Sequence, residues 1–235
     1  MPALFLEASA GIMSGQMQKD VGMILSDASL TLGRSDSAIE VYEYFLQKNP
    51  DRPDIYVKLG DVQVKEDELS AAITSYRAAL ARDSGNIIIL AKLTRLLNRT
   101  GKEKEADQLS RKIILTQTSN PEYIGIIGDI ALELGMYLEA FNRYSRQLEL
   151  TPDNGMSHEK RADVIFALLS IPNAGVHASE SLKSKNLYKE GVSDYMRAQQ
   201  LLPERFEIIS NKITKHSGEF IPVSINEFES RYNSF

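Results

Sequence analysis

The feature that most constrains this sequence is a repeat of 34 residues, marked by four evenly spaced alanines. These are Ala38, Ala72, Ala106 and Ala140. The positions four residues further along hold Tyr42, Tyr76, Ser110 and Tyr144. Offsets of 0 and 4 fall on one face of an α-helix, so each repeat is expected to contain a helix that buries this face. A sustained period of this length restricts the chain to folds built by stacking one supersecondary unit.

A second helical face precedes the first in every repeat. In the second repeat it consists of Tyr56, Leu59, Gly60 and Gln63. Between the two helices, one column holds Gly33, Asp67, Gly101 and Gly135. Glycine is favoured where a helix ends in a left-handed residue, so this column is expected to form the turn. Each repeat therefore reads as helix, turn, helix.

This pattern resembles the tetratricopeptide repeat, a helix-turn-helix unit of 34 residues. The second repeat carries the resemblance through Tyr56, Leu59, Gly60, Ala72, Tyr76 and Ala79. The fourth repeat carries it through Gly128, Ala140, Tyr144 and Pro152, whereas the third has Thr94 and Ser110 in place of the glycine and the aromatic residue. The resemblance implies an all-α fold, a right-handed superhelical array of antiparallel helix pairs.

The glycines of the second and fourth repeats need a separate explanation, because glycine in a helix interior costs about 1 kcal/mol relative to alanine. We expect Gly60 and Gly128 to lie where the paired helices cross closely, opposite the small residues Ala72 and Ala140. This is a packing role and implies no active site.

The period also predicts how the chain is organised. Residues 1–18 form a half repeat or capping helix, which suggests a segment of a longer array. Residues 155–203 form a fifth repeat with an insertion near 171–187, and residues 204–235 form a C-terminal capping helix and an aromatic tail. The four regular repeats lie between them at 19–154, namely 19–52, 53–86, 87–120 and 121–154.

Composition excludes several classes of function. The formal charge is −5, which disfavours nucleic acid and anionic membranes as partners. The chain has no cysteine, and its three histidines, at 158, 177 and 216, are too scattered to form a metal site. It shows no secretory signal and no apolar run of about 20 residues. We therefore expect a cytoplasmic protein that is not an enzyme and has no cofactor or metal.

In arrays of this family the first helices line a concave groove, which is where the resemblance places a binding site. One groove column forms a ladder: Asp27, Asp61, Arg95, Asp129 and Asp163. Neighbouring columns supply the remaining candidate contacts: Lys58, Lys92, Met23, Val57, Val64 and Leu132. Such a groove suits a peptide or helix of another protein that carries basic residues. An alternative is that the aspartates only solvate the helix face.

The predicted function is thus a non-catalytic scaffold for protein interaction. Some members of the family clamp a partner's terminal carboxylates with lysines and asparagines, but the equivalent positions here include Met23, Asp27 and Ile88, so that pattern is absent. The alternative function is self-assembly, in which copies stack through their terminal helices into a homo-oligomer.

Overall fold

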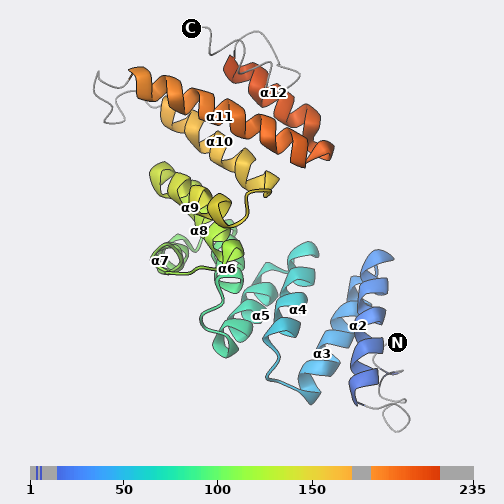
Figure 1. The fold of residues 1–235 in the computed structure, drawn as a ribbon. Helices are drawn as coiled ribbons and strands as arrows, with labels where there is room; N and C mark the ends of the chain where they lie inside the picture. Colours follow the sequence, from blue (N-terminus) through green and yellow to red (C-terminus); the bar gives the residue numbers. More distant parts are fainter. Residues whose placement is uncertain (1–3, 5, 7–14, 171–180, 218–235) are drawn as a thin grey trace. The chain divides into compact units, whose positions relative to one another are not determined.

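The computed structural model describes residues 4, 6, 15–170 and 181–217, and these residues contain helices and no strand (Figure 1). The chain divides into two compact units, residues 1–113 and 114–235. The helices of the first unit are α2 (Gly15–Thr31), α3 (Ser35–Lys48), α4 (Pro53–Lys65), α5 (Leu69–Arg82), α6 (Ile87–Arg99) and α7 (Glu103–Ile114), the last residue of which belongs to the second unit.

The second unit contains the helices that follow. They are α8 (Pro121–Glu133), α9 (Tyr137–Leu150), α10 (Gly155–Ser170), α11 (Ser181–Leu201), the 3-10 turn η2 (Pro203–Arg205) and α12 (Phe206–Ser217). The predicted segments at 1–18, 171–187 and 218–235 lie wholly or partly outside the described residues. The all-α array of helix pairs agrees with the fold class that the sequence predicts.

Local sequence explains where the helices begin and turn. The side chain of Asn120 accepts hydrogen bonds from the backbone of Glu122 and Tyr123 at 2.9 and 3.4 Å, which caps α8. Asn86 caps α6 in the same way. The turn column predicted from sequence is confirmed, because its four members have positive φ: Gly33 (70°), Asp67 (61°), Gly101 (73°) and Gly135 (70°).

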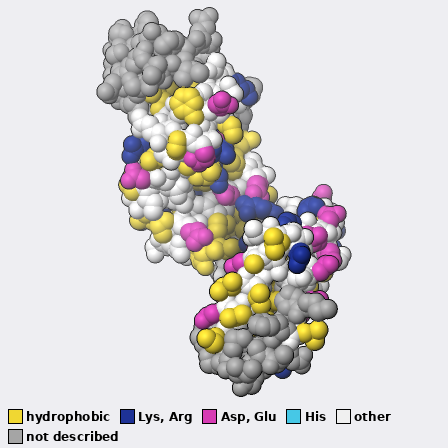
Figure 2. Space-filling view, turned by 90° about the vertical axis from the view of Figure 1, so that its right-hand side faces the viewer, with side chains coloured by type: hydrophobic (Ala, Val, Ile, Leu, Met, Phe, Trp, Pro, Cys, Tyr) yellow, Lys and Arg dark blue, Asp and Glu magenta, His cyan; other side chains and the backbone are white. Residues whose placement is uncertain are grey.

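The core of each unit lies between the paired helices. The four period-marking alanines, Ala38, Ala72, Ala106 and Ala140, are all fully buried. Tyrosines from the second helix of a pair fill the space beside them: Tyr42, Tyr76, Tyr144 and Tyr195. The charged groups remain outside, and Figure 2 shows acidic and basic side chains lying among one another on one face of the protein.

The residue that faces each helical glycine differs from the sequence expectation. A Cβ atom on Gly60 would lie 2.6 Å from Cε1 of Tyr76, and one on Gly128 would lie 2.8 Å from Cε1 of Tyr144. The expectation that alanines stand opposite these glycines is therefore wrong. The missing side chain makes room for a tyrosine ring of the paired helix.

Gly60→Ala should lower the free energy of unfolding by about 1–3 kcal/mol, because the Tyr76 ring is buried and cannot move aside without strain. The better helix propensity of alanine offsets only part of this cost. Urea denaturation of the full chain followed by circular dichroism measures it. Gly85→Ala is the control, since a Cβ there meets nothing within 4 Å. A Gly60→Ala variant as stable as the wild type would contradict the packing role.

Candidate functional site

The aspartates of the predicted ladder are tied to their neighbours by a repeated set of hydrogen bonds. Asp61 Oδ1 accepts from the Tyr76 hydroxyl at 2.6 Å and from Lys92 Nζ at 2.7 Å. Asp129 Oδ1 accepts from Tyr144 and Lys160, both at 2.7 Å. Each set joins a first helix, its paired second helix and the next first helix. We call this arrangement the Asp–Tyr–Lys link.

The link has variants at the other positions of the ladder. Asp163 accepts from the Tyr195 hydroxyl at 2.6 Å and from Lys212 of α12 at 2.7 Å. Asp27 and Lys58 are 3.9 Å apart, a looser ion pair. The third repeat lacks the necessary residues. It has an arginine, a serine and an isoleucine in the three columns, at positions 95, 110 and 126.

The link fixes the protonation of its tyrosines. Burial raises the pKa of Tyr76 and of Tyr144, and the adjacent Asp61 and Asp129 carboxylates raise it further. Both phenols therefore stay neutral donors at physiological pH. Since every linked aspartate also has a lysine beside it, the ladder presents neutralised pairs rather than a row of bare carboxylates.

The remaining predicted site residues lie partly within the helix packing. Met23 is half-buried against the core of α2, α3 and α4, and Val57 and Val64 are half-buried against the core of α5 and α6. Leu132 packs on the core of α8 and α9. The predicted set is divided between the units: Asp129, Leu132 and Asp163 belong to residues 114–235, and the other eight belong to residues 1–113.

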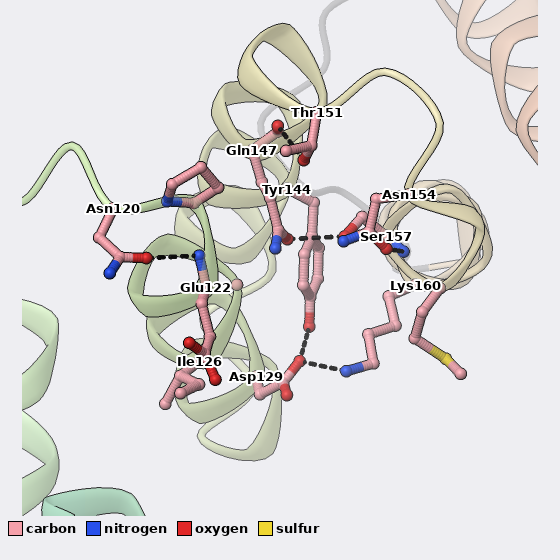
Figure 3. A pocket seen from close by; sticks show the side chains of 13 residues that line it. Asn120, Glu122, Ile126, Asp129, Tyr144, Gln147, Thr151, Asn154, Ser157 and Lys160 are labelled. Carbon is pink, nitrogen blue, oxygen red and sulfur yellow. Dashed lines mark hydrogen bonds and ion pairs between the residues drawn. The ribbon is translucent and has the colours of Figure 1, made fainter. Parts of the chain in front are cut away.

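A pocket of about 500 Å³ opens on the first helices of the second unit (Figure 3). Helix α8 forms one wall, α10 forms the other, and α9 supplies the floor. Of the predicted site residues, Asp129 lines it. The full lining is Asn120, Pro121, Glu122, Gly125, Ile126, Asp129, Tyr144, Gln147, Thr151, Asn154, Met156, Ser157 and Lys160.

Two residues that the sequence reasoning missed create this space. The column of Gly125 holds Val57, Ala91 and Glu159 in other repeats, so the pocket lies where a wall side chain is missing. The column of Gln147 holds Phe45, Ala79 and Ile113. A Cβ atom on Gly125 would lie 2.5 Å from Nε2 of Gln147. A glycine and a glutamine that both depart from the repeat pattern were the available signal.

Charged side chains are also buried elsewhere in the second unit, where they hold helices together. Asp194 accepts from Arg161 Nε at 2.7 Å and Nη2 at 2.8 Å, and lies 2.7 Å from His158 Nδ1. Glu159 accepts from Arg205 and Lys212, each with a shortest distance of 2.7 Å. His158 thus has a structural partner on α11.

The described residues contain no group of three or more histidine or carboxylate side chains arranged to hold a metal ion. Within that same part of the chain, none of the helices combines the length and the apolar character needed to cross a membrane. The geometry on the page is that of a binding pocket between helices.

Comparison with known proteins agrees with this architecture. Residues 25–87 match a family model described as Tetratricopeptide repeat. A stretch of 87 residues is 30% identical to cellulose synthase operon protein C of Pseudomonas fluorescens (strain SBW25), covering 37% of this chain and 7% of that protein. The corresponding protein of Xanthomonas axonopodis pv. citri is 39% identical over 87 residues, which cover 36% of this chain and 6% of the relative. The chain therefore spans less than a tenth of the length of the curated relatives that it matches.

Two solved structures show the same fold at low sequence identity. PilF of Pseudomonas aeruginosa is 19% identical with a TM-score of 0.53, and the match covers 91% of this chain and 96% of PilF. YrrB, described as a TPR protein with an unusual peptide-binding site, is 14% identical with a TM-score of 0.50, and the match covers 80% of this chain and 88% of YrrB. The repeat pattern, the paired helices and these matches together show that the chain belongs to the tetratricopeptide repeat family.

Proposed function

We propose that the protein is a non-catalytic scaffold that binds a peptide or helix of a partner protein along the first helices of its repeats. The observation that carries this proposal is the pocket between α8 and α10, which lies on the groove side of the helix pairs and has a volume typical of ligand sites. The related fold of YrrB, whose title names a peptide-binding site, supports the same use of the helices.

The proposed contact surface comprises the ladder and the columns beside it. Its members are Asp27, Asp61, Arg95, Asp129, Asp163, Lys58, Lys92, Met23, Val57, Val64 and Leu132. A basic residue of a partner would have to compete with the lysine that already neutralises each linked aspartate. Hydrogen bonds and apolar contacts are therefore proposed to supply most of the affinity, with charge giving orientation.

The test uses a displayed library of random dodecapeptides selected on the immobilised full chain, followed by fluorescence polarisation with an enriched peptide. The variant Asp61→Asn with Asp129→Asn keeps an oxygen acceptor for each tyrosine and removes two charges from the groove. Asp36→Asn with Asp107→Asn removes two exposed charges from second helices and is the matched control.

We expect the groove variant to change affinity by about 2- to 10-fold, as one or two hydrogen bonds would, and the control to leave it unchanged. A lysine-rich or arginine-rich peptide should weaken, because each aspartate loses its charge. If no peptide is enriched, or if both variants behave like the wild type, the proposed groove function is wrong.

A second candidate function is self-assembly. Ile24 and Leu32 lie eight residues apart on one face of α2 and are 66% and 70% exposed, which is unusual for aliphatic side chains on a regular helix. A second copy stacking on this face would cover them. A mass that rises with concentration in multi-angle light scattering would support this function, and a constant monomer mass would exclude it.

A further inference from the structure

The floor of the pocket contains a buried amide with half of its hydrogen bonds unmade. Gln147 is only 6% exposed and points from α9 into the space between α8 and α10 (Figure 3). Its Oε1 accepts from the Ser157 hydroxyl at 2.6 Å. Its Nε2 has no hydrogen-bond partner among the residues that the structure describes. Buried polar groups are usually paired, so this donor indicates an acceptor that comes from outside the chain.

The surroundings limit the charge of that acceptor. The lining contains two carboxylates, Glu122 and Asp129, and one cation, Lys160, which already donates to Asp129 at 2.7 Å. A carboxylate or phosphate ligand would meet an excess of negative charge. A neutral carbonyl oxygen can accept from Gln147 without that repulsion.

The opposite wall adds a hydrogen-bond acceptor. Glu122 lies on α8 at the rim of the pocket, and its carboxylate is exposed. A ligand group that both accepts and donates would use Gln147 and Glu122 together. Gly125, between them on the same wall, leaves the room that such a group requires.

We propose that this pocket binds the side-chain carboxamide of an asparagine or glutamine carried by the partner peptide. The ligand's carbonyl oxygen accepts from Gln147 Nε2, and its NH2 group donates to the Glu122 carboxylate. The assignment rests on the proposed peptide-binding function and adds to it the class of side chain that the second unit selects.

The experiment titrates the 15N-labelled full chain with acetamide, the smallest mimic of this side chain, and follows the backbone signals of Gly125 and Ser157. We expect saturable shifts with a dissociation constant on the order of millimolar, as suits a ligand of four heavy atoms. Acetate should bind more weakly. N-methylacetamide, which mimics the peptide backbone, should also bind more weakly than acetamide.

Two variants test whether Gln147 is responsible. Gln147→Leu should weaken acetamide by about 2- to 10-fold, the effect of one lost hydrogen bond. Gln63→Leu is the matched control, because Gln63 is buried and accepts from Ser75 in the same manner but belongs to the other unit. Gly125→Ala, which places a Cβ against the Gln147 amide, should weaken binding without removing that amide.

The outcomes separate this inference from the proposed function. Acetamide binding that equals that of acetate, or that survives Gln147→Leu, overturns the carboxamide site even if library peptides bind elsewhere. Tighter binding of N-methylacetamide would assign the site to the peptide backbone and overturn the side-chain proposal. Acetamide binding at Gln147 with no enriched peptide would leave the pocket established and the groove function refuted.

Discussion

Replacing Arg161 by methionine should lower the free energy of unfolding of the unit formed by residues 114–235 by about 3–5 kcal/mol. Arg161 joins α10 to α11 through two hydrogen bonds to Asp194, whose side chain is only 5% exposed. Without the guanidinium, a buried carboxylate keeps only His158 as a charged or polar partner of comparable strength. The cost comes mainly from the charge left behind.

Hydrogen exchange of the full chain, read over α10 and α11, and urea denaturation measure this loss. Arg146→Met is the control, because Arg146 pairs with Glu149 at an exposed site and should matter by less than about 1 kcal/mol. A double variant, Arg161→Met with Asp194→Leu, should recover much of the stability, since an apolar pair can replace a buried ion pair. Equal losses in the Arg161 variant and its control would contradict the assigned burial.

The second large effect concerns Glu159, whose side chain is 2% exposed beneath α12. Arg205→Met together with Lys212→Met removes both cations that reach it and should cost about 3–5 kcal/mol at neutral pH. Lys160→Met breaks the corresponding bond to Asp129 at a half-exposed site and should cost only about 0.5–1.5 kcal/mol. Thermal denaturation of the full chain ranks the two.

The sign of the pH dependence should also reverse in the double variant. Burial by itself raises the pKa of Glu159, but the hydrogen bonds from Arg205 and Lys212 outweigh it and hold the pKa below its ordinary value. The wild type therefore loses this contribution as the pH falls through the lowered pKa. Without the cations, burial leaves the pKa above about 4.3, so stability rises as the pH falls toward that value. Parallel pH profiles would show that Glu159 is not the buried acid.

The sequence was sufficient for the features that repeat. The alanine column, the turn glycines and the substitution of Asp67 all follow from one period, because each repeat must meet the same packing and backbone requirements. The Asp–Tyr–Lys link was not recognised, although its residues were named, because it joins positions 31 residues apart in successive repeats. A period calls attention to equal spacings and hides such cross-repeat pairs.

The candidate site was less predictable than the fold. The pocket depends on Gly125 and Gln147, and each is a departure from its column whose effect appears only when both are placed together. The contacts of Glu159 depend on α12, which follows an insertion that shifts the register of the fifth repeat. Neither side chain signals its partner by sequence spacing alone.

The Asp–Tyr–Lys link bears on how an array of this kind can change length in evolution. Its aspartate and lysine always occupy the same two columns of neighbouring repeats, as in Asp61 with Lys92 and Asp129 with Lys160. Insertion or loss of one whole repeat therefore hands each lysine a new aspartate, and no buried phenol loses its acceptor. The third repeat, with Arg95, Ser110 and Ile126, cannot be copied in this way. Gene duplication would conserve charge pairing everywhere in the regular array except beside that repeat.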